Sequence, residues 1–163
     1  MTVSQYNQCV DIYSDGLYRF ILKNMRSEDH AHDVVQESYV KLWKKHEKVE
    51  YEKAKSYLFT TAYHVMIDFF RKEKRISFVE QFNESDLTSY HHQPYVDVDK
   101  MINLALEKIP HVQKSALLLR DYEGYSYEEI GEILSLNESQ VKVYIYRARK
   151  AMRLFIGSLD NMI

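Results

Sequence analysis

Apolar residues recur at three- and four-residue spacing along most of the chain, and strand-like alternation is hard to find. This spacing puts apolar side chains on one face of an α-helix, so it predicts an all-α fold. The N-terminal part should contain three helices that cover one another's apolar stripes in a small bundle. The stripes are Val3, Tyr6, Val10, Tyr13, Leu17 and Phe20; Ala31, Val34, Val35, Ser38, Tyr39, Leu42 and Trp43; and Ala54, Leu58, Thr61, Ala62, Val65 and Phe69.

Residues typical of helix ends set the boundaries that we predict. Ser27 is a candidate cap for the second helix, and the third should run from about Lys53 to Lys74. A fourth helix should end near Ile109, with Pro110 as the first residue of the next because that position needs no amide hydrogen. Gly124 can take the left-handed conformation that closes a helix.

Two further helices follow in close succession and predict a helix-turn-helix. Ser126-Tyr127-Glu128-Glu129 has the form of a capping box, in which a hydroxyl and a glutamate satisfy free amides, and Asn137 to Gln140 repeats it. The short turn Ser135-Leu136-Asn137 joins these helices, and Leu136 should fill the angle between them.

Charge is unevenly distributed, although the formal net charge of the 163 residues is only −2. Basic residues cluster at 71–75 and again at 142–153, whereas residues 76–99 carry five acidic side chains and no Lys or Arg. Such a segment is typical of a linker between modules. We therefore predict two small helical domains, residues 1–76 and 100–163, joined by a flexible acidic linker at 77–99.

Other features of the sequence argue for a protein of the cytoplasm. No apolar run approaches the roughly 20 residues that a bilayer crossing requires, and the N-terminus lacks the order of a signal peptide. The single cysteine, Cys9, has no partner for an internal disulfide, and we expect it to pack inside its helix.

The last helix has a second face whose residues suit DNA. A helix fits the major groove, where early side chains meet base edges and later cations meet phosphates. Arg147 could pair with a guanine and Gln140 with an adenine, whereas Lys142, Arg149, Lys150 and Arg153 suit the backbone. A solvated basic face is the plainer alternative. The candidate DNA-binding residues of this helix are Ser139, Gln140, Lys142, Val143, Tyr146, Arg147, Arg149 and Lys150.

Three stretches resemble bacterial RNA polymerase sigma factors. LEKIPHVQKSALLLRDYEGYSYEEIGEILSLNESQVKVYIYRARKAMR, residues 106–153, resembles region 4, which reads the −35 element. DVVQESYVKLWKK, residues 33–45, resembles region 2.2, and AKSYLFTTAYHVMIDFFRKEKR, residues 54–75, resembles regions 2.3 and 2.4. Two such domains on a short linker are similar to the extracytoplasmic-function (ECF) group. The resemblance implies an alternative sigma factor that directs promoter recognition, DNA melting and transcription initiation.

The resemblance also implies partners and a surface for the polymerase. In the family the region 2.2 helix binds the clamp helices of the beta-prime subunit, and the C-terminal domain is expected to meet the beta flap. An anti-sigma factor is a further implied partner. The residues expected to bind core polymerase are Asp33, Gln36, Glu37, Val40, Lys41 and Lys44. An ordinary charged solvent face is the alternative interpretation of these side chains.

The third helix would melt the −10 element and capture unstacked bases, a task that needs aromatic platforms and cations. The expected residues are Lys55, Tyr57, Phe59, Tyr63, His64, Asp68, Arg71, Lys72, Lys74 and Arg75. His64 stands where relatives commonly have Asn. Val143 and Tyr144 stand where relatives often have a small polar and a basic residue, so base preferences should differ there.

Two other classes of protein are alternatives to this interpretation. An enzyme or metal site is disfavoured because His30 and His32 lie two apart on a helix and face different directions. His91 and His92 fall in the expected linker. We expect no catalytic residue, metal or cofactor. A stand-alone helix-turn-helix regulator with an N-terminal sensing or interaction domain is the remaining alternative.

Overall fold

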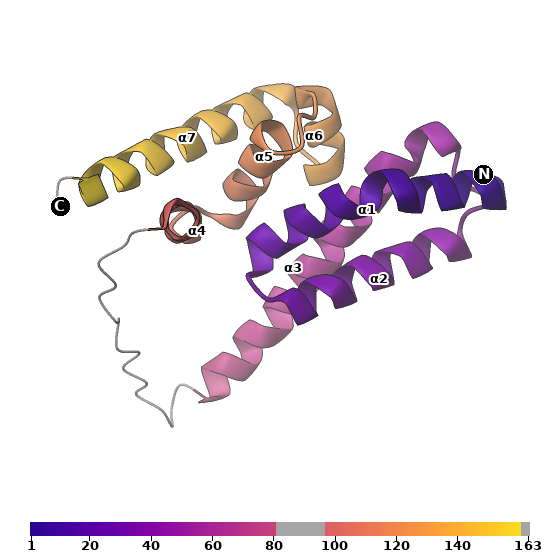
Figure 1. Ribbon diagram of the computed structural model, residues 1–163, viewed down its shortest axis with the longest axis horizontal. Helices are drawn as coiled ribbons and strands as arrows, with labels where there is room; N and C mark the ends of the chain where they lie inside the picture. The colour runs from indigo at the N-terminus through magenta and orange to yellow at the C-terminus, as the bar shows by residue number, and fades with distance from the viewer. Residues whose placement is uncertain (81–96, 161–163) are drawn as a thin grey trace.

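The computed structural model describes residues 1–80 and 97–160, and this part is helical without strands (Figure 1). The elements in chain order are α1 (Val3–Met25), α2 (Glu28–Lys44), the 3-10 helix η1 (Tyr51–Lys53), α3 (Ala54–Glu80), α4 (Val98–Glu107), α5 (His111–Asp121), α6 (Tyr127–Leu134) and α7 (Glu138–Asp160). The all-α prediction is confirmed.

Helices α1, α2 and α3 pack on one another, and we call them the N-terminal body. Their core includes Leu17, Phe20, Leu42 and Leu58, all essentially inaccessible to solvent. Cys9 is also buried, as expected for a packing residue, and burial raises the pKa of its thiol. The three apolar stripes therefore meet as the sequence predicts.

Three details of the predicted stripes differ from the structure. Val3, at the start of the first stripe, is 55% exposed. Trp43, in the last turn of α2, was expected to face inward. Its indole contacts the ring of Tyr6 of α1, with centroids 5.0 Å apart, but the residue remains 43% exposed. On α3 the fully buried positions include Phe59 and Met66, whereas Val65 and Phe69 are only half-buried. The α3 face that packs is therefore rotated slightly from the predicted one.

Helices α4 to α7 form a second unit, the C-terminal body, in which α7 packs on each of the other three. Pro110 directly precedes α5, and Gly124 has a φ of +72° just after it. The capping box at the start of α6 is present, since Ser126 Oγ accepts from the Glu129 amide at 3.1 Å and Glu129 Oε2 accepts from the Ser126 amide at 3.0 Å. Helix α4 ends two residues before the predicted Ile109, Pro110 caps α5 instead of beginning it, and α5 ends three residues before Gly124, so these predicted helix ends hold to within three residues.

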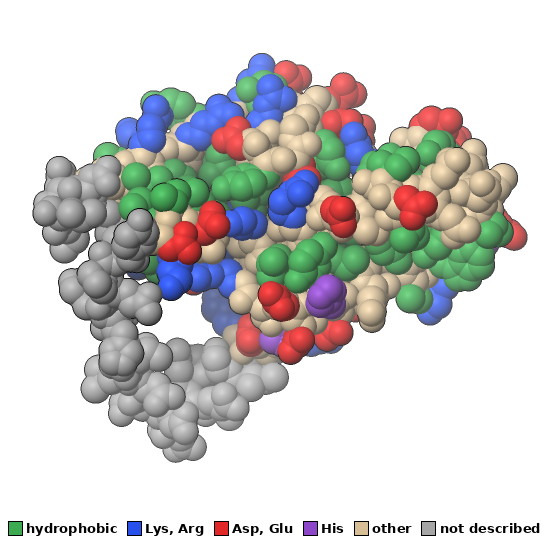
Figure 2. Space-filling view, in the orientation of Figure 1, with side chains coloured by type: hydrophobic (Ala, Val, Ile, Leu, Met, Phe, Trp, Pro, Cys, Tyr) green, Lys and Arg blue, Asp and Glu red, His purple; other side chains and the backbone are tan. Residues whose placement is uncertain are grey.

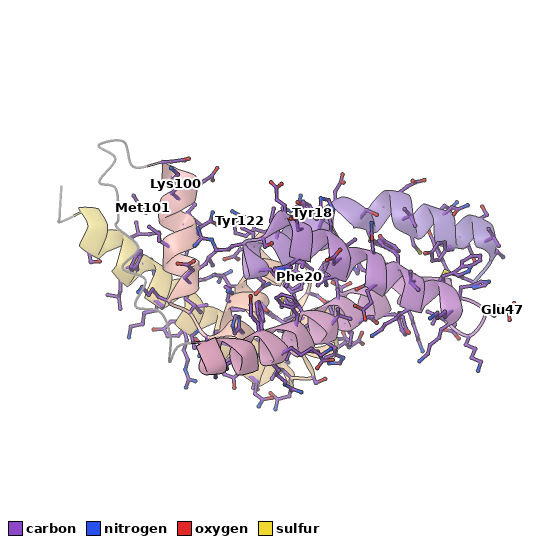
Figure 3. The ribbon with its side chains drawn as sticks, turned by 90° about the horizontal axis from the view of Figure 1, so that it is seen from below. Tyr18, Phe20, Glu47, Lys100, Met101 and Tyr122 are labelled. Carbon is purple, nitrogen blue, oxygen red and sulfur yellow. The ribbon has the colours of Figure 1, made fainter. Side chains whose placement is uncertain are left out.

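The two bodies lie against each other, with α5 beside α1 and α6 beside α3 (Figure 1). In the view from below, Tyr122 lies between Tyr18 of α1 and the α4 residues Lys100 and Met101, whereas Glu47 lies at the far end of the N-terminal body (Figure 3). Helix α3 continues to Glu80, four residues into the predicted linker, and residues 81–96 lie outside the described part. The domain boundaries remain a prediction.

Candidate nucleic-acid interface

The helix-turn-helix consists of α6, a tight turn and α7. Ser135 closes α6 with a left-handed φ of 57°, and the Leu136 amide donates to Gly131 O at 2.9 Å. A Cβ atom on Gly131 would lie 2.6 Å from Leu136 O, a distance that real contacts do not allow. The absence of a side chain at Gly131 therefore lets the turn pack on α6 and sets the angle at which α7 leaves.

Helix α7 has one packed face and one open face. Val141, Ile145 and Ala148 are buried in the C-terminal body. Lys and Arg side chains gather over α7 along the upper edge of the molecule (Figure 2). All eight predicted DNA-binding residues of this helix are exposed: Ser139, Gln140, Lys142, Val143, Tyr146, Arg147, Arg149 and Lys150.

Several of these exposed side chains already have partners within the chain. Gln140 Oε1 accepts from the Asn137 amide at 3.0 Å, so this side chain completes the predicted helix cap. Lys142 lies 3.2 Å from Glu138. Arg149 points back to Asp121 at the end of α5, with Nε 3.1 Å from Oδ2.

Arg147 and Lys150 differ from Arg149 in their surroundings. Within the described part of the chain neither forms an ion pair, and both side chains are open to solvent. A phosphate or a base edge can therefore reach these two cations without displacing a carboxylate, whereas Arg149 would first have to leave Asp121.

Helix α3 presents most of its predicted residues on the surface of the N-terminal body. His64, Asp68, Arg71, Lys72 and Lys74 are exposed, and Asp68 lies 3.7 Å from Arg71. Lys55, Tyr57 and Tyr63 are half-buried, and burial raises the pKa of the Tyr63 hydroxyl. The side chain of Arg75 lies outside the described part.

Phe59 is a correction to the predicted α3 set. Its ring is fully buried, with its centroid 5.8 Å from that of Phe20 and 5.1 Å from that of Tyr125. Because a stacking platform must offer a free face, Phe59 cannot serve a base in this arrangement and is a core residue. Sequence could not separate it from its neighbours, since aromatic residues occupy several sides of α3.

The face of α2 that is predicted to bind the polymerase is exposed to solvent. Asp33, Gln36, Glu37, Val40, Lys41 and Lys44 are all exposed, and Lys41 lies 3.4 Å from Glu37. Val40 is 50% exposed, and half-exposed Trp43, three residues later, stacks on His46 with centroids 4.3 Å apart. Trp43 was not predicted to be a surface residue. Its place in the last turn of α2 was the feature of the sequence that could have indicated its exposure.

Two hollows bring residues of different helices together. A small one of about 160 Å³ between α2 and α3 places Asp33 and Glu37 beside Asp68 and Lys72, so the predicted polymerase and DNA residues adjoin. A larger one of about 850 Å³ lies between the bodies. Its lining includes Lys55, Tyr57 and His64 of α3 and Glu129 and Glu132 of α6.

Metal-binding clusters and membrane-spanning helices are both absent from the described part of the chain. No group of three or more His, Cys, Asp or Glu side chains within it is placed to hold a metal ion, and the linker histidines His91 and His92 lie outside it. None of its helices combines the length and the apolar character that a membrane crossing requires.

Known proteins match the chain over both bodies. Residues 9–76 match Sigma-70 region 2, and residues 99–152 match Sigma-70, region 4. The RNA polymerase sigma factor SigV of Bacillus subtilis is 33% identical over 93% of this chain and 91% of its own length. The ECF RNA polymerase sigma-E factor of Haemophilus influenzae is 30% identical over 89% and 84%.

A solved structure matches the same span. The sigma factor RpoE, crystallised in complex with the anti-sigma factor NepR from Bartonella quintana, superposes with a TM-score of 0.79 over 95% of this chain and 98% of its own, at 24% identity. The fold match thus extends over α1 to α7. The family models and the sequence relatives show that the chain belongs to the ECF group of bacterial RNA polymerase sigma factors.

Proposed function

We propose that this alternative sigma factor divides promoter recognition between α7, which reads the upstream element, and α3, which opens the downstream one. The observation that carries the proposal is the pair of open faces on separate bodies. One is the basic outer face of α7. The other is the surface of α3, on which His64, Arg71 and Lys72 are exposed and the aromatic residues Tyr57 and Tyr63 are half-buried. Transcription initiation requires both a duplex reader and a single-strand trap, and these faces suit one task each.

At the −35 element, Arg147 is the proposed base reader and Lys150 a proposed phosphate contact. Both cations are open to DNA, and a guanidinium can donate two parallel hydrogen bonds to a guanine edge. Val143 and Tyr146 lie on the same exposed face and can make apolar contacts with thymine methyl groups. The Gln140 amide can donate to a base while its carbonyl oxygen caps the helix.

At the −10 element, exposed His64 is the proposed contact to an unstacked base, with Arg71 and Lys72 holding phosphates. Imidazole can donate, accept and stack, so His64 can serve a flipped base although it differs in shape from the Asn common among relatives. Half-buried Tyr57 and Tyr63 supply aromatic surface beside it.

For the polymerase, we propose that the exposed face of α2 docks on the clamp helices of the beta-prime subunit and that the C-terminal body meets the beta flap. Val40 and Trp43 add apolar area among charged neighbours, a composition that suits a protein interface. The site of action would be the cytoplasm, where the polymerase works. An anti-sigma factor is a proposed regulator, because the solved structure of RpoE contains such a partner.

The test is in vitro transcription of fragmented genomic DNA with core polymerase, with and without the purified chain, followed by mapping of RNA 5′ ends. We expect new start sites that share two sequence elements and require the chain. Co-purification with core polymerase should accompany this activity. DNA binding without core association or new start sites would instead support a stand-alone helix-turn-helix regulator.

A further inference from the structure

The face of α7 that points away from the C-terminal body has an apolar centre. Val143 is 44% exposed and Tyr146 is 61% exposed, so both side chains are open to solvent. At about 100° of turn per residue, Val143 lies almost directly opposite the buried Val141 and Ile145. A β-branched side chain left in solvent stabilises neither the helix nor the core. Folding therefore does not explain why an apolar residue occupies the centre of this face.

The polar side chains in the first turns of α7 are mostly held by other groups of the chain. Gln140 Oε1 accepts from the Asn137 amide at 3.0 Å, so only its NH2 group remains free to meet a base. Lys142 lies 3.2 Å from Glu138. Arg147, by contrast, forms no ion pair with any residue that the structure describes. Base discrimination on this face therefore depends mainly on Arg147 and on the apolar side chains beside it.

An apolar side chain in the major groove distinguishes thymine from the other bases. Thymine alone presents an apolar group there, its 5-methyl group. The side chain of Val143 can neither donate nor accept a hydrogen bond. Against the thymine methyl it buries apolar surface, whereas against guanine, adenine or cytosine it covers a polar edge without pairing it, which costs free energy. One valine thus favours thymine and disfavours the other three bases.

The spacing between Val143 and Arg147 determines how far apart their base pairs lie. Four residues of an α-helix rise about 6 Å along its axis, and base pairs of B-DNA repeat every roughly 3.4 Å. A helix that lies along the groove therefore places these two side chains against base pairs one or two steps apart. Tyr146, next to Arg147 in sequence, widens the exposed apolar surface around Val143.

We propose that Val143 is a specificity-determining residue of α7. It selects a −35 element that places the 5-methyl group of a thymine one or two base pairs from the guanine read by Arg147. Tyr146 lies beside this contact and shields it from water. The inference rests on the proposed role of α7 at the −35 element, and it names the base and the chemical group that this helix selects next to its guanine.

The test removes the methyl group and leaves the rest of the base in place. Promoter duplexes found by the genomic transcription assay are made with each thymine of the −35 element, on either strand, replaced singly by deoxyuridine. This replacement keeps every hydrogen-bonding group of the base. Gel-shift titrations with core polymerase and the full chain then give the ratio of the affinities for the thymine and uracil duplexes.

With the wild-type chain, one thymine should show an affinity ratio of roughly fourfold, the gain expected from one buried methyl group. Val143→Ser should bring that ratio to about one, because it removes the apolar contact, and Val143→Ile should keep it. Leu154→Ser is the matched control. Leu154 is an exposed apolar residue of the same helix, 66% exposed and about three turns further on, so its loss should leave the ratio unchanged.

Three results would overturn this role of Val143. One is a −35 element in which no thymine responds to the loss of its methyl group. Another is a responsive thymine more than two base pairs from the guanine whose replacement no longer matters to Arg147→Ala. The third is a Val143→Ser variant that keeps the wild-type ratio. Failure of the proposed sigma function would appear separately, as a wild-type chain that yields no new start sites with core polymerase.

Discussion

At the scale of single residues, solvent exposure and existing ion pairs distinguish side chains that look alike in sequence. Arg147, Arg149 and Lys150 are neighbouring cations, yet Arg149 is held by Asp121 while the other two face solvent. Side-chain direction on α7 decides this, because Arg149 points toward the end of α5 and Arg147 points away from the body. Phe59 likewise cannot bind DNA in this arrangement, because its ring is buried in the core.

Arg147 and Lys150 should respond differently to removal. Arg147→Ala should weaken binding to the −35 element by about 1–3 kcal/mol and relax base choice, whereas Lys150→Ala should weaken binding evenly across sequences. Gel-shift titrations of the variants with core polymerase, against promoter fragments substituted singly in the −35 element, measure both effects. Equal losses on every fragment for both variants would contradict the assignment of Arg147 to base reading.

The stability of the molecule should fall in mild acid through His111. This imidazole stacks on Phe70 with centroids 4.6 Å apart, and burial together with the nearby Lys114 charge lowers its pKa. In the unfolded chain the imidazole takes up a proton near pH 6.5, whereas in the folded chain it does so only at lower pH. The stability that neutral His111 contributes is therefore fully present above about pH 6.5 and is lost as the pH falls below it.

His111→Gln should therefore reduce the drop in Tm between pH 7.5 and pH 5.5 relative to the wild type, because the replacement does not titrate. Thermal melts followed by circular dichroism at the two pH values give the comparison. An equal drop in both proteins would show that His111 does not carry this part of the pH dependence.

At the scale of elements, the sequence specified helix ends well and buried faces less well. Capping residues act locally, so the box at Ser126 and the left-handed Gly124 could be predicted without knowing the fold. The packed face of α3 depends on the side chains that α1, α2 and α6 place against it, and no local sequence pattern contains that information. Its aromatic residues therefore divide between core and surface in a way that only tertiary contacts determine.

The α6–α7 turn should depend on Gly131 for steric reasons. Gly131→Ala places a methyl group against Leu136 O, and we expect a loss of about 1–3 kcal/mol in the free energy of unfolding. Gly157→Ala is the control, because nothing lies within 4 Å of that position in α7 and alanine favours a helix by roughly 0.5–1 kcal/mol. Urea denaturation measures both variants; a neutral Gly131→Ala would show that the turn can shift.

At the scale of the whole molecule, the relation between the two bodies was beyond sequence reasoning. Each ion pair between them joins residues that are far apart in the sequence. Arg19 and Glu123, for example, are 104 positions apart. Neither residue stands out in its own helix, where it looks like ordinary surface charge. The two-domain prediction followed from motifs and charge distribution, while the closed arrangement emerges only when the surfaces are placed together.

We propose that one chain reads a promoter at two points and opens it together with polymerase. Permanganate reactivity of thymines, at a promoter found by the genomic transcription assay, tests it most directly. With core polymerase and the wild-type chain, we predict reactive thymines confined to the −10 region. Replacing both His64 and Arg71 by Ala should abolish that reactivity while leaving protection of the −35 element. Unchanged melting in this variant, or melting without core polymerase, would contradict the account.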